Sequence, residues 1–230
     1  MRKAYDAPFL PMKMCNFASE KADKMDKAHF SLTHLTTALP RAEYVRDYRD
    51  TARFTSYCAQ CGQYGRRWSC PPYDFDVEKR VEQYETVVII GTKITFEKTL
   101  QQVYPTAQER NQISNDAMRY AGKVMQRQHE KWEAQYPGSY SFISANCFLC
   151  GDTPCARLEG KMCRHPERMR HSLESFGFDI GKTATSLLGI DLKWARGNEL
   201  PEYLMLVTAL FLPQSYMFNG DLSFDTPKID

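Results

Sequence analysis

Cysteine is the residue type whose spacing in this sequence most clearly indicates chemistry. One group has the spacing C-x2-C-x8-C and consists of Cys58, Cys61 and Cys70. A second group has the spacing C-x2-C-x4-C-x7-C and consists of Cys147, Cys150, Cys155 and Cys163. In a reducing compartment, clustered cysteines more often bind metal or carry out redox chemistry than form disulfides. We therefore expect two metal-binding cysteine loops, at residues 58–70 and 147–163.

The second group supplies four thiolates within 17 residues, which is a complete ligand set. Both Zn²⁺ and a [4Fe–4S] cluster accept four thiolates. Zinc sites usually present two short cysteine pairs separated by a long stretch, whereas the third and fourth cysteines here are not paired. The spacing favours an iron–sulfur cluster, and zinc is the alternative.

The first group has three cysteines, so its ligand set is either open or completed from elsewhere. Cys70 is followed by two prolines, and a Cys-Pro ending also occurs in ferredoxin-type cluster motifs. Cys15, a histidine or a carboxylate would close the site, although a lone thiol is the simpler interpretation of Cys15. A C-x2-C redox pair or half of a zinc ribbon are further alternatives. The C-x3-C-x2-C spacing of radical-SAM enzymes is not found in these groups.

Charged and aromatic residues surround both groups. Five basic residues accompany the second group: Arg157, Lys161, Arg164, Arg168 and Arg170. Cations beside a cubane raise its reduction potential, although such charges usually form a solvated face. We expect His165 to occupy a helix-entry position and His171 to be partly exposed, with a ligand or proton-donor role as the alternative. Near the first loop, Tyr57, Tyr64, Trp68 and Tyr73 either shape a pocket or pack in the core.

Periodicity places these loops between regular elements. We expect four strands, at Phe30–His34, Thr86–Ile94, Ser139–Ala145 and Tyr203–Leu212. We expect five helices: Tyr44–Ala52, a short helix after Asp76, a long helix from the Thr106/Glu109 capping box to Gln135, Pro166–Gly177 and Asp179–Gly189. Alternating strands and helices favour a layered domain. The expected fold class is α+β, with a mixed central sheet of about four strands covered by helices. Residues 1–28 have no sustained period and are expected to be a leader, followed by a single metal-binding domain over 29–230.

Composition narrows the function classes. Thirty Lys and Arg against 28 Asp and Glu give a net charge of +2, which argues against nucleic-acid binding as the main function. The sequence has no apolar run long enough for a membrane helix, and its opening residues lack the apolar core of a secretory signal. We therefore expect a cytoplasmic protein with reduced thiols.

Two segments resemble a known family. YRDTARFTSYCAQCGQYGRRWSCPPYDFD (Tyr48–Asp76) and CARLEGKMCRHPERMRHSLESFGFDIGKT (Cys155–Thr183) are similar to the prokaryotic predicted metal-binding proteins of domain-of-unknown-function family 2284. The resemblance covers roughly residues 40–212 and leaves Cys15 outside. It implies metal binding through all seven clustered cysteines and says little about a reaction.

The sequence therefore predicts an iron–sulfur protein with two [4Fe–4S] sites that acts in electron transfer or as a small redox enzyme. A zinc-stabilised interaction module is one alternative. An enzyme that uses the open iron of the three-cysteine cluster as a Lewis acid is another. The expected partner is a redox protein or a small-molecule substrate, which the residues do not identify.

Overall fold

The computed structural model describes residues 29–101, 104, 106–143, 147–194, 197–216, 218 and 222–224, so the predicted leader and Cys15 lie outside it. The strands are β1 (Phe30–Pro40), β2 (Thr86–Phe96), β3 (Tyr140–Phe142) and β4 (Tyr203–Leu212). The helices are α1 (Arg41–Tyr48), α2 (Thr51–Gln60), α3 (Val77–Val81), α4 (Ala107–Gln135) and α5 (Ile180–Leu187). Three short 3₁₀ helices are η3 (Lys98–Leu100), η4 (Ala156–Glu159) and η5 (Glu174–Phe176).

The four strands form one sheet in the order β1-β2-β4-β3. This confirms the α+β class and the expected number of strands, but each neighbouring pair is antiparallel rather than mixed. The reason is the position of β4. The strands β2 and β3, which α4 connects, run in the same direction, but β4 lies between them and pairs with both.

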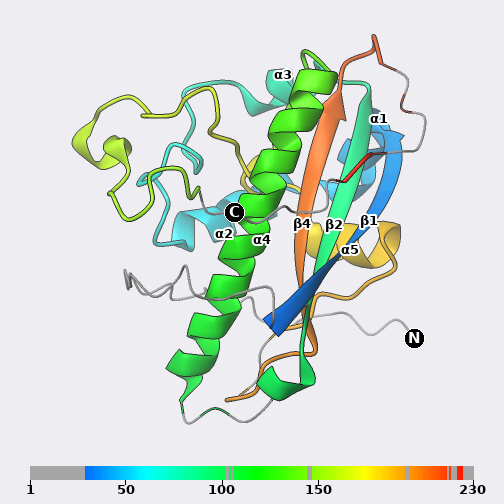
Figure 1. The fold of residues 1–230 in the computed structure, drawn as a ribbon. Helices are drawn as coiled ribbons and strands as arrows, with labels where there is room; N and C mark the ends of the chain where they lie inside the picture. Colours follow the sequence, from blue (N-terminus) through cyan, green and yellow to red (C-terminus); the bar gives the residue numbers. More distant parts are fainter. Residues whose placement is uncertain are drawn as a thin grey trace.

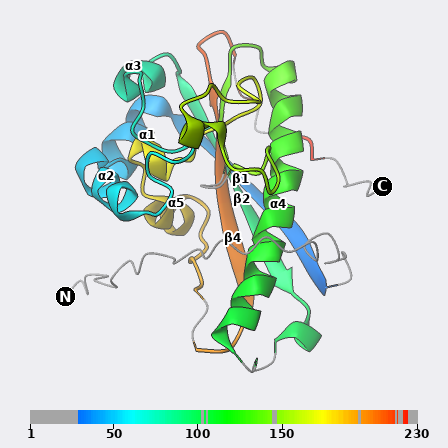
Figure 2. The same cartoon turned by 90° about the vertical axis from the view of Figure 1, so that its left-hand side faces the viewer.

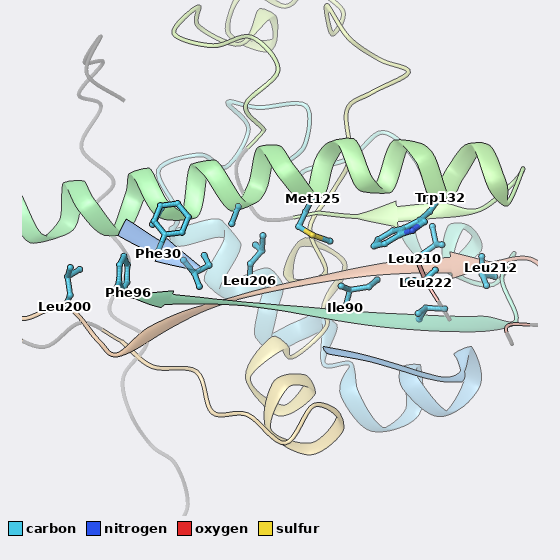
Figure 3. Close-up of a cluster of buried hydrophobic side chains, with 14 of the residues drawn as sticks. Phe30, Ile90, Phe96, Met125, Trp132, Leu200, Leu206, Leu210, Leu212 and Leu222 are labelled. Carbon is cyan, nitrogen blue, oxygen red and sulfur yellow. The ribbon is translucent and has the colours of Figure 1, made fainter. Parts of the chain in front are cut away.

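Helices cover both faces of this sheet. Helix α4 crosses one face, while α1, α2 and α5 lie on the other (Figures 1 and 2). Alternate side chains of β2 serve the two cores, since Ile90 packs in the α4-side cluster and Ile89 in the opposite one. Figure 3 shows Met125 and Trp132 of α4 directed toward the strands, and both are almost fully buried. The sheet is therefore a rigid support with a core on each side.

Local sequence signals explain where most helices begin. Thr106 and Glu109 form the predicted capping box of α4, and Asp179 accepts a hydrogen bond from the Lys182 N–H at the start of α5. The helix expected at Tyr44–Ala52 is divided into α1 and α2, because Arg49 at the end of α1 has extended backbone and Asp50 caps α2 by accepting from the Arg53 N–H.

The helix expected from Pro166 does not form, and only the 3₁₀ turn η5 ends at Gly177. Backbone groups of this segment bond to other parts of the fold instead: the Ile143 N–H donates to the His171 carbonyl, beside a β-bridge between Phe142 and His171. Pairing with the end of β3 thus replaces the hydrogen bonds that a helix would need. Gly177 still ends the turn as predicted, with a positive φ of 90°.

Candidate metal centre

The first cysteine loop grows directly from helix α2. Cys58 lies in the last turn of this helix rather than beyond it, and the Cys61 N–H donates to the Cys58 carbonyl at the C-cap. The chain then turns back through a hydrogen bond from the Gly65 N–H to the Pro71 carbonyl, 2.8 Å long. Gly65 has φ of 68°, a conformation that favours glycine. This turn brings Cys70 back toward the helix end.

The second cysteine loop leaves β3 and is fixed to helix α4. The Phe148 ring packs so closely on Gly122 that a Cβ there would lie 2.7 Å from a ring carbon. Past Cys150 the chain turns at Gly151, whose φ is 59°. Cys155 caps the 3₁₀ helix η4, and the His165 N–H donates to the Cys163 sulfur at 3.4 Å. The loop is thus held by its own backbone and by one aromatic contact with α4.

Two arginines join the loops to each other. Nη1 of Arg67 donates to the Cys147 carbonyl at 2.8 Å, and Nη1 of Arg157 donates to the Arg67 carbonyl at 2.8 Å and the Cys70 carbonyl at 2.6 Å. The Trp68 indole N–H donates to the Lys161 carbonyl, and the guanidinium of Arg157 lies over the Trp68 ring. In Figure 1 the two loops, cyan and yellow-green, lie side by side. The cysteine groups therefore belong to one interlocked substructure.

The thiols of the first loop act on one another electrostatically. Burial, together with smaller effects of Glu174, Cys70 and Cys61, raises the pKa of Cys58 to about 12. Burial also raises the pKa of Cys70, as does Cys61, while Arg67 and Arg157 oppose this. All three cysteines are therefore neighbours, in the presence of one carboxylate and two cations.

The second loop shows the same pattern. Burial raises the pKa of Cys147, and Cys163 and Cys150 add to this effect. Burial likewise raises the pKa of Cys163, with further contributions from Cys155 and Cys150. All four cysteines are thus linked through Cys163. Nη1 of Arg164 lies 3.9 Å from the Cys150 sulfur and donates to the Pro154 carbonyl, which keeps a cation beside this group.

The donor chemistry of both loops fits a thiolate-bound metal group. None of the seven described cysteines is in a disulfide, and all but Cys61 are partly shielded from solvent. Within the part of the chain that the structure describes, however, no three His, Cys, Asp or Glu side chains are already spaced to hold a metal ion. Each loop therefore brings its own thiols near one another, but the described side chains are not already arranged as a metal-binding site. Burial is the main cause of the raised thiol pKa values. A bound metal cation would favour the deprotonated thiolates and offset the cost of burying their charge.

His171 and the basic residues that accompany the second cysteine group lie in different environments. His171 is buried, at 6% exposure, which corrects the expectation of partial exposure. The basic residues divide: Arg157 and Arg164 face the cysteine loops, while Arg168 and Arg170 pair with Glu130 and Glu133 of α4.

The aromatic residues of the first loop also divide between roles. Tyr73 packs against the core on the α1 side of the sheet, as expected for a core aromatic, and Trp68 bridges to the second loop. Two residues near the thiols were missed from the sequence: Arg67, which reaches Cys147, and Glu174, which acts on Cys58. Arg67 lies in a basic pair between Cys61 and Cys70, but nothing in its spacing identifies a partner 80 residues away.

Comparison with known proteins places the chain in a family. Residues 44–212 match the model of the predicted metal-binding proteins, domain of unknown function 2284, and the chain belongs to that family. The matched range contains both cysteine loops and the arginines that join them. No curated protein and no solved structure gave a match. In the described residues, no helix has the length and apolar character needed to cross a bilayer.

Proposed function

We propose that this metal-binding protein is an iron–sulfur protein with two cluster sites. Cys147, Cys150, Cys155 and Cys163 would hold one [4Fe–4S] cluster, and Cys58, Cys61 and Cys70 would hold the second. The observation that carries the proposal is the reciprocal bridge of Arg67 and Arg157, which holds the three-cysteine loop and the four-cysteine loop against each other. Two thiolate sites in direct loop-to-loop contact suit a relay better than two independent structural metals.

The surroundings of the thiols support a redox role. A [4Fe–4S] cluster supplies one-electron transfer when it is bound, at a potential set by charge and by hydrogen bonds to sulfur. Arg67, Arg157 and Arg164 place positive charge beside the two groups, and the His165 N–H donates to a cysteine sulfur. These residues would offset the negative charge of a thiolate-bound cluster. We propose electron transfer or a small redox activity in the cytoplasm, with a redox protein or small molecule as partner.

The three-cysteine site favours a second candidate function. A cubane held by three thiolates leaves one iron available to a substrate or to an oxygen ligand. Glu174 acts on Cys58 and belongs to η5, which packs against α2, so a carboxylate is near this site. The three thiolates alone leave an iron open, so an enzyme that uses this iron as a Lewis acid is the alternative, whereas Glu174 as a fourth ligand would close the site. A zinc-stabilised interaction module is the remaining alternative.

Anaerobic purification with quantification of iron, acid-labile sulfide and zinc, followed by EPR of the reduced protein, tests the proposal. We expect a brown protein that bleaches with dithionite and contains roughly eight iron and eight sulfide per chain. Cys150→Ser should remove roughly half of the iron, and Cys61→Ser the other half. Ser56→Ala, on the exposed surface of α2, is the matched control and should keep all of it.

Two results would contradict the iron–sulfur proposal. Stoichiometric zinc without sulfide, together with unfolding by a chelator, would establish the zinc module instead. A colourless anaerobic preparation that lacks both metals would remove the metal function altogether.

A further inference from the structure

A cavity of about 350 Å³ lies where the segments that follow the two cysteine loops meet. Phe75, which follows the first loop, and Pro166, which follows the second, both line it. Arg80 of α3, Glu133 of α4 and Tyr140 of β3 also line it. This volume is within the range of small-molecule sites. None of its described lining residues is a cysteine, although two of the segments that line it continue directly from the cysteine loops.

The cavity contains a cation that no carboxylate neutralises. Arg170 pairs with Glu133, and these two side chains are only 14% and 18% exposed. Arg80, by contrast, has no carboxylate partner among the described residues. Its guanidinium carbon lies 5.1 Å from the Phe75 ring centroid and 5.6 Å from that of Tyr140. Two guanidinium groups and one carboxylate give this cavity an excess of positive charge.

Neutral hydrogen-bonding groups complete the polar part of the lining. The Ser139 hydroxyl is buried and has no hydrogen-bond partner within the described part of the chain. A buried polar group without a partner costs free energy, so a ligand that supplies one is stabilised here. Next to it, the Tyr140 hydroxyl and Nδ1 of His171 are joined by a hydrogen bond. Burial, together with smaller effects of Arg80 and Arg170, lowers the pKa of His171 to about 3, so the ring is neutral near pH 7.

We propose that this cavity binds a small organic anion, with its oxyanion at Arg80 and Ser139 and its apolar body against Phe75, Pro166 and Met169. A guanidinium without a carboxylate partner and a hydroxyl without a hydrogen-bond partner, both among the described lining residues of this cavity, suit a carboxylate or a phosphate ester. Apolar walls with a few polar groups are the usual form of such sites.

The cavity lies close to the first cysteine loop. The Tyr73 and His171 rings meet edge to face with centroids 4.8 Å apart, and the Tyr73 hydroxyl donates to the carbonyl of Ser69, the neighbour of Cys70. Binding of the anion does not depend on the metal. A role for that anion as the substrate of a redox reaction does rest on the proposed function.

Equilibrium dialysis of the full chain tests the site with three probes of similar shape: benzoate, phenyl phosphate and neutral benzyl alcohol. We expect one molecule of at least one anion per chain, with benzyl alcohol bound at least tenfold more weakly. The two anions distinguish a carboxylate site from a phosphate site. Arg80→Gln should weaken anion binding by about tenfold or more, whereas Lys79→Gln, an exposed neighbour on the same helix, should not change it.

Ser139→Ala is the second variant, because removal of an unpartnered hydroxyl should not harm folding, and it should also weaken anion binding. Wild-type affinity in both the Arg80 and Ser139 variants would overturn the proposal, as would equal binding of benzyl alcohol. Metal content is measured on the same samples. Metal-free protein that binds an anion through Arg80 would support the anion site and contradict the proposed metal function. Iron-loaded protein that binds neither anion would support the metal function and overturn the anion site.

Discussion

Arg67 and Arg157 form a reciprocal bridge between the two cysteine loops. Arg67 of the first loop donates to the Cys147 carbonyl at the start of the second, and Arg157 of the second donates to the Arg67 and Cys70 carbonyls of the first. Each arginine uses donors at fixed angles, which suits a planar guanidinium and not an ammonium. The bridge thus sets the relative position of the cysteine groups without contributing a ligand.

Arg157→Ala should weaken this bridge and lower the metal content of both loops. It removes hydrogen bonds to three carbonyls, those of Arg67, Cys70 and Pro72, and we expect a loss of about 1–3 kcal/mol in the free energy of unfolding. Urea unfolding and metal analysis measure the two effects. Arg157→Lys should not restore the wild type, since one ammonium cannot make the same fork of bonds. Arg66→Ala, at an exposed arginine of the first loop, is the control, and identical behaviour of the Ala variants would contradict the prediction.

Gly122→Ala should disturb the second loop selectively. The new Cβ would lie 2.7 Å from the Phe148 ring, so the ring must shift away from α4, and we expect this to disturb the segment between Cys147 and Cys150 that carries it. We expect roughly half of the metal to be lost, although alanine favours a helix more than glycine does. The double variant Gly122→Ala/Phe148→Ala removes the clash and should regain part of that metal. Equal metal content in the wild type and the single variant would show that this contact does not position the loop.

The sequence predicted the elements whose signals are local. The capping box of Thr106 and Glu109 and the Asp179 cap gave the starts of α4 and α5, because each cap bonds to a backbone N–H within three residues. The β-branched run from Thr86 predicted β2, and the apolar run from Tyr203 predicted the central strand β4. The helix expected at Pro166 failed, because the His171 carbonyl pairs with Ile143 near the end of β3.

In the candidate site, too, only the features with local signals in the sequence were predictable. Cysteine spacing assigned the members of each group, since neighbours in sequence stay neighbours in a loop. The bridge between the groups was not predictable, because Arg67 and Cys147 are 80 residues apart and any surface arginine has the same local pattern. The burial of His171 beside Tyr140 likewise depends on how β3 and the second loop meet.

Acid should destabilise the fold through His129 of α4. This ring is fully buried and hydrogen-bonded to the Ser141 and Thr208 hydroxyls, and burial lowers its pKa to about 3. The unfolded chain binds a proton near the ordinary histidine pKa of about 6.5, whereas the folded chain does not. Its contribution is therefore present in full above pH about 6.5 and is lost as the pH falls toward 3, by up to about 1.4 kcal/mol per pH unit.

Urea unfolding between pH 7 and pH 4 measures this slope. His129→Gln should be less stable at pH 7, because the core loses a fitted ring, but should lose less stability between pH 7 and pH 4 than the wild type. His29→Gln, at an exposed histidine, controls for the substitution and should keep the wild-type slope. A slope in His129→Gln as steep as in the wild type would assign the acid sensitivity to other groups.

The fourth position of the three-cysteine site can be assigned in a chain where that site alone binds metal. In a Cys150→Ser background, which disables the second loop, Cys15→Ala should leave the metal content unchanged. Glu174→Gln should lower it, because Glu174 is close enough to raise the pKa of Cys58 and a carboxamide is a poorer metal ligand than a carboxylate. Glu43→Gln, at an exposed position of α1, carries the same change in charge and should have no effect. Metal analysis together with EPR of the reduced protein separates the outcomes. Loss of the remaining metal in Cys15→Ala would instead identify a site closed by four thiolates, which leaves no iron open to a substrate and removes the Lewis-acid alternative.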